Sequence, residues 1–270
     1  MTTSALRSLG SEIVTAARNR FLGALAPDDF DLVAPHLAET ALMPGSLLHE
    51  PGQAIKRVCF PCSGLVSLLA ILPEGHAIDT VTIGRDGAIG LGAALGSPIP
   101  WTRAVVQLPG RALEMPATRL AELADRSRSL RAAIARYGDI LTGQVQQTVV
   151  CNTVHPVQAR LCRWLLQARD RSGGDVVTVT QELLSGILGV QRTTVTLVSR
   201  VLQAENIVHV RRGHIQIRDV AALERKACSC YRIGRRLSEQ IGREIARPAA
   251  IHAVRGGNGT AAIPRADTLD

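Results

Sequence analysis

The spacing of apolar residues divides the chain into regions with different predicted structure. Between residues 40 and 116, short apolar runs alternate with turns that contain glycine or proline, which is typical of a β-sandwich or barrel-like module. The predicted strands are Val58 to Phe60, Leu65 to Leu72, Ile78 to Ile83, Ala104 to Leu108 and Arg111 to Met115. Residues 17 to 37 suggest short helices before this module, one of them starting at Pro27.

After Thr118 the apolar period becomes helical. Leu130, Ile134, Tyr137 and Leu141 follow an alternating four-three spacing, which is characteristic of a helix that pairs with another helix. The pattern predicts a dimerisation helix over residues 119 to 152, with these four side chains at the contact. A shorter helix is expected to follow, from Val157 to Arg169.

Residues 180 to 202 predict two short amphipathic helices joined at a glycine. Thr180 can cap the first helix through its hydroxyl group, and Gly189 stands where a helix ends in the left-handed region. The second helix has an inner face composed of Val195, Val198, Val201 and Leu202. Helix, turn and helix in this order predict a helix-turn-helix, whose second helix lies in the major groove of DNA.

The segment that follows predicts a β-hairpin. Apolar and polar residues alternate on both sides of Arg212-Gly213, and a two-residue turn ending in glycine fits a tight hairpin. The predicted register pairs Val210 with Ile215 and Val208 with Ile217. A helix-turn-helix followed by such a hairpin is a winged helix.

The distribution of charge supports a DNA partner. The chain has 31 Lys and Arg against 23 Asp and Glu, a formal net charge of +8. Residues 1 to 152 hold 13 side chains of each sign, whereas residues 153 to 236 hold 14 basic and 6 acidic side chains. The whole excess therefore lies in the region of the winged helix, as expected for a surface that meets phosphate groups.

Composition excludes several other classes of protein. Aromatic residues make up 3% of the chain, which argues against base stacking on single-stranded nucleic acid. No apolar run approaches the roughly 20 residues that cross a bilayer, and the N-terminus does not resemble a signal peptide. We therefore expect a cytoplasmic protein with no membrane partner.

The outward residues of the second helix and of the wing are candidate DNA contacts. Arg192, in the first turn, is expected to read a base, and Leu197 either touches a thymine methyl group or packs against neighbouring protein. Arg200 and Arg212 are expected to contact phosphates. The complete candidate set is Gln191, Arg192, Thr193, Thr194, Thr196, Leu197, Ser199, Arg200, Arg211 and Arg212.

Five segments in order resemble the CRP/FNR superfamily of bacterial transcription regulators, from about residue 20 to residue 231. The segments are Phe60-Pro61-Cys62-Ser63-Gly64-Leu65-Val66-Ser67, Ile83-Gly84-Arg85-Asp86-Gly87, the helix-turn-helix, Arg212-Gly213-His214-Ile215 and Cys228-Ser229-Cys230-Tyr231. The resemblance implies a homodimer that binds an inverted-repeat operator on double-stranded DNA. It also implies contact with RNA polymerase if the protein is an activator.

The resemblance also implies an α+β fold class and a division of the chain. The expected architecture is an antiparallel, jelly-roll-like β-roll, a long dimerisation helix and a C-terminal winged helix-turn-helix. The expected boundaries are an N-terminal extension at 1–20, a β-roll sensor at 21–118, the dimerisation helix at 119–152, the winged helix at 153–231 and a largely disordered tail at 232–270.

The chain departs from the family pattern in the recognition helix and in the roll. Thr193 and Leu197 replace an acid and an arginine of the best-known recognition helices, so the usual half-site is not expected. The roll has no acid where cyclic nucleotide ribose would bind, and Arg103 is only a weak candidate for an effector phosphate. We therefore expect neither cyclic AMP nor an iron-sulfur cluster, no cofactor and no metal, and the small-molecule effector is unknown.

The six cysteines leave two alternatives open. A thiol-based redox-responsive regulator would use Cys59 and Cys62, or Cys228 and Cys230. A cysteine-dependent enzyme would use Cys151 and His155, which stand four residues apart. Pro156 favours a helix boundary beside that pair, and no third orienting group is visible, so no catalytic residue is assigned and a non-enzyme is expected.

Overall fold

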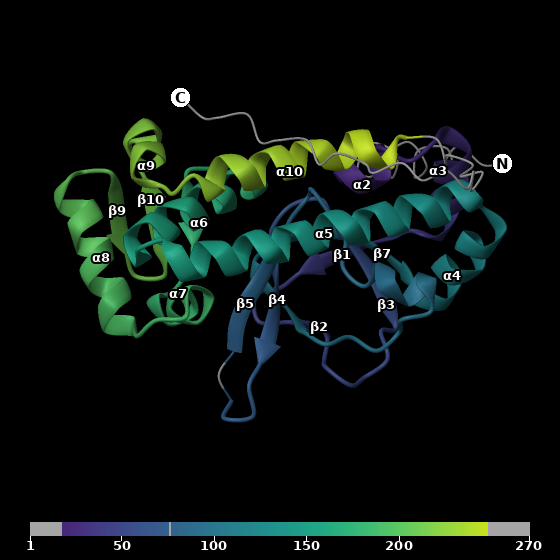
Figure 1. Ribbon diagram of the computed structural model, residues 1–270, viewed down its shortest axis with the longest axis horizontal. Coiled ribbons are helices and arrows are strands. Elements are labelled where there is room, and N and C mark those ends of the chain that lie inside the picture. The colour runs from purple at the N-terminus through teal and green to yellow at the C-terminus, as the bar shows by residue number, and fades with distance from the viewer. Residues whose placement is uncertain (1–17, 76, 248–270) are drawn as a thin grey trace, which may run out of the picture.

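The computed structural model describes residues 18 to 75 and 77 to 247 (Figure 1). Within them, an N-terminal antiparallel β-roll is built from a sheet of order β1-β7-β3 and a sheet of order β2-β6-β4-β5. The strands are β1 (Ala38–Leu42), β2 (Leu47–His49), β3 (Arg57–Pro61), β4 (Leu65–Ile71), β5 (Ala77–Ile83), β6 (Arg103–Leu108) and β7 (Gly110–Pro116). The predicted α+β class is confirmed.

The sequence pattern predicts five of these strands and misses β1 and β2. Of the five residues in β1 only Leu42 is buried, and β2 is three residues long and lies at the edge of its sheet. Neither strand shows the apolar alternation that a half-buried strand normally carries. Their pairing with β7 and β6 provides the stabilisation that their own side chains do not.

Helices cover the roll and extend away from it. They are α2 (Arg20–Gly23), α3 (Pro27–Val33), α4 (Ala117–Arg126) and α5 (Arg128–Val154), with the short 3-10 helices η1 (Ala34–His36) and η2 (Leu91–Leu95). The helix expected over 119–152 is thus two helices that meet at Ser127. The Ser127 hydroxyl accepts a hydrogen bond from the Leu130 backbone at 3.2 Å and caps α5.

The apolar seam of α5 faces its own chain. Leu130, Ile134 and Tyr137 are buried in a core shared with α2, α4 and the roll, and Leu141 packs half-buried against that core. Tyr137 also exchanges hydrogen bonds with both backbone groups of Ala88 at 3.0 and 3.1 Å. The prediction that this seam contacts a partner is therefore wrong, because the spacing identifies a buried face without saying what buries it.

The C-terminal half is a helical domain with a three-stranded sheet of order β8-β10-β9. Its elements are α6 (Val157–Ser172), β8 (Val176–Thr178), α7 (Gln181–Leu188), α8 (Arg192–Ala204), β9 (Val208–Arg211), β10 (His214–Ile217) and α9 (Val220–Lys226). Val210 pairs with Ile215 and Val208 with Ile217. The predicted wing and its register are confirmed, and β8 is an additional strand.

A helix stands where a disordered tail is expected. α10 (Cys230–Ile245) runs beside α5 and reaches α2 at the far end of the molecule (Figure 1). Tyr231, Ile241 and Ile245 are buried, because these few apolar residues share one face of an otherwise arginine-rich helix. The disorder prediction is wrong for residues 232 to 245, and residues 248 to 270 lie outside the described chain.

One turn of the roll joins the two halves. Asp86, in the turn after β5, accepts hydrogen bonds from Nε and Nη2 of Arg171 on α6, both at 3.1 Å, and from Ser238 Oγ of α10 at 2.6 Å. A Cβ at Gly84 would stand 2.9 Å from the Arg171 side chain, so only glycine permits this approach. The ion pair is largely buried.

The described part of the chain contains no helix that is long and apolar enough to cross a membrane.

Breaking the Asp86–Arg171 ion pair should destabilise the protein strongly. Asp86→Asn leaves the buried Arg171 guanidinium without its counter-charge, which costs about 3–5 kcal/mol in the free energy of unfolding. Denaturant unfolding at neutral pH measures this loss. Asp139→Asn, an exposed change on α5, is the control and should stay within about 0.5 kcal/mol of the parent.

The Asp86–Arg171 ion pair also determines whether the stability of the fold rises or falls as the pH is lowered. Burial alone would raise the pKa of Asp86, but the Arg171 charge and the hydrogen bonds from Ser238, Arg171 and Gly84 together lower it. A lowered pKa stabilises the fold above the unfolded value of about 3.9, and that contribution is lost as the pH falls through the folded value. Asp86→Asn should flatten this acid limb, and an unchanged limb would contradict the assignment.

Candidate nucleic-acid interface

The helix-turn-helix has the local structure that its sequence predicts. Thr180 Oγ1 accepts a hydrogen bond from the Leu183 backbone at 3.1 Å and caps α7. Gly189 ends α7 with a φ of +62°, in the left-handed region. Both features are confirmed, and they determine the angle at which α8 leaves α7.

The inner face of α8 is rotated from the predicted one. Val195, Ser199 and Leu202 are buried, whereas Val201 is 39% exposed. At about 100° per residue, Ser199 and Leu202 lie close to the direction of Val195, and Val201 lies about 120° away. The prediction that Ser199 contacts DNA is therefore wrong, since its side chain is 3% exposed.

The outer face of α8 is open to solvent. Thr193, Leu197 and Arg200 are exposed along one line of the helix, and Leu197 is 64% exposed. Leu197 is therefore not part of a hydrophobic core within the described chain. Arg192 Nη1 lies 3.1 Å from Glu182 Oε2 of α7, with both side chains mostly exposed.

Neighbouring groups position this face. Thr196 donates a hydrogen bond to Gln181 Oε1 at 2.8 Å, which ties α8 to the start of α7. Gln203 Oε1 accepts from the Val210 backbone at 2.8 Å, which ties α8 to the wing. The exposed face of α8 is therefore tied to α7 by the half-buried Thr196 and to the wing by the exposed Gln203.

The remaining candidates lie at the edges of the exposed face. Gln191 precedes α8 as its N-terminal flanking residue and is exposed, while Thr194 is half-buried. Arg211 and Arg212 are both exposed beside Gly213, whose φ is +81°. Gln191 and Thr194 therefore lie at the start of α8 and Arg211 and Arg212 on the wing, in the domain that carries the excess positive charge.

Arg103, the weak effector candidate, is engaged by an acid. Its Nε lies 2.9 Å from Glu50 Oε2, at the edge where β6 pairs with β2. A guanidinium paired in this way has its charge compensated, so it offers little attraction to an effector phosphate. The structure favours a structural role for Arg103.

Cys162 is buried in the core of the C-terminal domain, and the other five cysteines lie in two regions of the molecule. Cys59 and Cys62 belong to different cores of the roll, so the geometry does not favour a redox pair there. Cys228 and Cys230 instead converge with Cys151 and His155. The backbone of the long helix and the chain after α9 bring these four together across more than seventy residues of sequence.

The enzyme alternative finds little support in this geometry. The Cys151 side chain is fully buried, which leaves a substrate no access to its sulfur. Its hydrogen bond to Cys228, together with burial, raises the pKa of Cys151 to about 12. A catalytic cysteine requires the opposite shift, because the thiolate is the nucleophile.

Comparison with known proteins agrees with this geometry. Residues 159–226 match the family model of the Crp-like helix-turn-helix domain. The matched segment contains α7, α8 and the wing. No curated protein gave a match to the chain.

Solved structures extend the likeness to the roll. The first is a transcriptional regulator of the CRP/FNR family from Eubacterium rectale, with a TM-score of 0.61 and 18% identity, covering 75% of this chain and 94% of that one. FixK2 from Bradyrhizobium japonicum has a TM-score of 0.62 and 13% identity, covering 72% and 98%. The c-di-GMP responsive regulator CLP from Xanthomonas campestris has a TM-score of 0.57 and 17% identity, covering 71% and 99%.

These comparisons confirm the resemblance to the CRP/FNR superfamily. The Crp-like domain carries it in sequence, and the roll, α5 and the winged helix carry it as a shared fold. At these sequence identities the structural neighbours show only that the fold is shared. Neither their signals nor their operators are inferred for this chain.

Alanine substitutions at two glycines of the Crp-like domain should have opposite effects on its stability. Gly189→Ala places a side chain in the left-handed region and should destabilise the domain by about 1–2 kcal/mol. Gly186→Ala lies inside α7, where the new methyl group would meet only ordinary contacts, and should stabilise by about 0.5–1 kcal/mol. Denaturant unfolding compares the two, and equal effects would contradict the proposed role of the turn.

Proposed function

We propose that the protein is a transcription regulator that binds double-stranded DNA in a sequence-specific manner as a homodimer. The observation that carries the proposal is the exposed outer face of α8, which lies beside a basic wing in a Crp-like helix-turn-helix domain. In this motif the second helix lies in the major groove, with its N-terminal residues at the base edges.

The chemistry of this face suits DNA. Arg192 stands in the first turn of α8, and its guanidinium can donate to both acceptors of guanine. Its ion pair with Glu182 is exposed and therefore contributes little, about 0–1 kcal/mol, so exchange for a base costs little. The exposed Leu197 suits a thymine methyl group, while Arg200, Arg211 and Arg212 suit phosphates.

A second stripe of α5 suits a partner helix. This stripe is displaced from the buried seam by one residue toward the C-terminus. Its residues keep the same alternating four-three spacing, which is typical of paired helices. Its members are small or apolar, and all but the half-buried Val145 are exposed: Ala135, Gly138, Thr142, Val145 and Val149. We propose a second copy of the chain as its occupant, because Gly138 and Ala135 would let two such helices approach closely.

A two-fold dimer determines the form of the operator. Each α8 would face one half-site, and the half-sites would lie about one turn of DNA apart as an inverted repeat. A DNA partner agrees with the cytoplasmic location expected from the sequence. An activator would in addition contact RNA polymerase.

Selection of bound sequences from a random double-stranded library tests the proposal. The full chain should enrich an inverted repeat with half-site centres about 10 base pairs apart. Enrichment of no sequence, or of a single direct site, would count against the homodimeric reading.

Alanine substitutions at Arg192 and Arg200 should weaken DNA binding in different ways. Arg192→Ala should lose about 1–3 kcal/mol on the selected site, with a much smaller loss on random DNA, because it removes a base contact. Arg200→Ala should weaken binding to both and make the salt slope shallower by about one unit. Arg128→Ala, an exposed change at the start of α5, is the control in filter-binding or anisotropy titrations.

Equal losses for Arg192→Ala on the two kinds of DNA would reduce Arg192 to a phosphate contact. An unchanged salt slope for Arg200→Ala would remove Arg200 from the interface.

Charges on the exposed stripe of α5 should prevent dimerisation. Thr142→Glu together with Val149→Glu would bury like charges against their symmetry mates, which a helix pair does not tolerate without large cost. Light scattering should report a monomer with weak operator binding. Ile99→Glu, which alters an exposed residue of the roll, is the control and should remain a dimer, whereas a dimeric double variant would place the contact elsewhere.

A further inference from the structure

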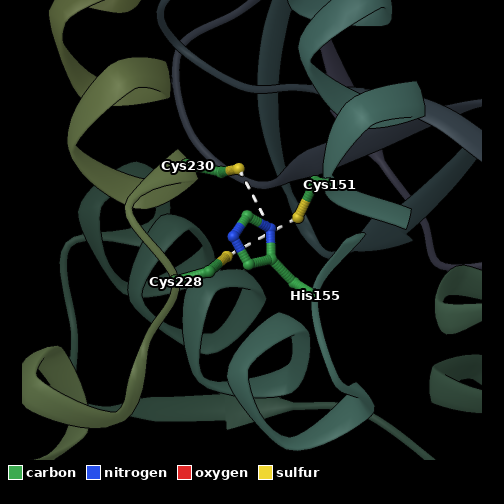
Figure 2. A group of neighbouring side chains, drawn as sticks. All are labelled: Cys151, His155, Cys228 and Cys230. Atoms are coloured by element: carbon green, nitrogen blue, oxygen red, sulfur yellow. Dashed lines mark hydrogen bonds between the residues drawn. The ribbon is translucent and has the colours of Figure 1, made fainter. Parts of the chain in front are cut away.

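Four potential metal ligands converge where the long helix ends. Cys151 lies in the last turn of α5 and His155 follows that helix, while Cys228 and Cys230 lie at the junction of α9 and α10 (Figure 2). Their four donor atoms all lie within 4.8 Å of one another. The Sγ atoms of Cys151 and Cys228 are 3.5 Å apart, and Cys230 Sγ is 3.5 Å from His155 Nδ1.

We propose that Cys151, His155, Cys228 and Cys230 bind one tetrahedral metal ion, with Zn²⁺ as the preferred cation. Three thiolates and one imidazole form a ligand set that zinc takes in closed structural sites. Bonds of about 2.3 Å to sulfur and about 2.0–2.1 Å to nitrogen require ligand atoms about 3.5–3.8 Å apart. The two 3.5 Å separations agree with these edges of a tetrahedron.

Other uses of these cysteines fit less well. A disulfide between Cys151 and Cys228 would need a sulfur–sulfur distance of about 2.05 Å and would leave Cys230 and His155 without a role. An iron-sulfur cluster has several irons, each with its own protein ligands, so its ligands spread around the cluster. Four donors this close together leave room for a single ion.

The surroundings favour the charged form of the site. Gln147 Nε2 donates a hydrogen bond to Cys230 Sγ at 3.1 Å, as expected of a group that orients a thiolate ligand. Arg160 and Arg163 are nearby, and the buried Nε atom of each has no hydrogen-bond partner within the described chain. Three thiolates with a divalent cation carry one negative charge, which these guanidinium groups would balance.

Proton release accompanies binding. Each thiol loses its proton, so three S–H bonds break, three metal–sulfur bonds and one metal–nitrogen bond form, and three protons pass to water. His155 is half-buried and gives the ion a route from solvent.

The position of the ion gives it a structural consequence. Pro156 separates α5 from α6, so the chain bends at this point between the long helix and the Crp-like domain. An ion held by both sides of the bend would fix the end of α5 to the segment that joins α9 and α10. The orientation of the DNA-binding domain relative to α5 would then depend on metal.

Metal content and cobalt spectroscopy of the full chain test the proposal. Elemental mass spectrometry of protein purified without chelators should find one zinc ion per chain. Apo-protein titrated with Co²⁺ under reducing, anaerobic conditions should show the intense visible bands of tetrahedral cobalt and thiolate charge-transfer absorption, saturating at one equivalent. Both metals should raise the melting temperature of the apo-protein.

Variants identify the ligands. The double variant Cys228→Ser, Cys230→Ser should lose stoichiometric metal and the cobalt spectrum, whereas Cys62→Ser, in the roll, should keep both. His155→Cys guards against a loss that reflects misfolding, because it should still bind cobalt, with stronger charge-transfer absorption from a fourth thiolate.

Several results would overturn the proposal. They are wild-type protein that binds no zinc or cobalt while its thiols are reduced, a cobalt spectrum of octahedral type, and a double variant that binds metal as the parent does. Recovery of the native chain with a Cys151–Cys228 disulfide and no metal would overturn it equally. None of these readouts uses DNA, so they stand apart from the proposed regulator function.

Discussion

The buried ion pair between Asp86 and Arg171 is the interaction on which the arrangement of the two halves depends. Asp86 belongs to a turn of the roll, Arg171 to α6 and Ser238 to α10, so three distant segments meet at one carboxylate. A buried charge without its partner is strongly destabilising. The roll and the Crp-like domain therefore cannot separate at this contact without a large energetic cost.

Close packing around the same turn leaves no room for a Cβ atom at two of its positions. Gly84 admits the Arg171 side chain, and a Cβ at Gly87 would stand 2.1 Å from the Tyr137 hydroxyl. The backbone carbonyl of Gly87 in turn accepts a hydrogen bond from the buried Asn19 side chain at 2.8 Å. Helices α2, α5 and α6 are thus positioned by one short loop, and neither Asn19 nor Asp86 can be picked out as a site residue from local sequence.

The helix α6 is held near both of its ends. Arg171 anchors its C-terminal end to the roll, and the group of Cys151, His155, Cys228 and Cys230 lies beside its N-terminal end. Because α6 packs beneath α7 and α8 in one core, a displacement at either anchor would move the exposed face of α8. The proposed metal ion and the ion pair would therefore act on the same DNA-binding surface from opposite ends of one helix.

The sequence by itself determined the features that depend on neighbouring residues. The Thr180 cap, the left-handed Gly189 and the pairing of Val210 with Ile215 follow from backbone hydrogen bonds and alternation over a few positions. Tertiary structure alone decided what each face meets. Ile134 faces its own roll, α10 packs on α5, and Cys151 meets Cys228 because such contacts depend on long-range packing, which periodicity does not encode.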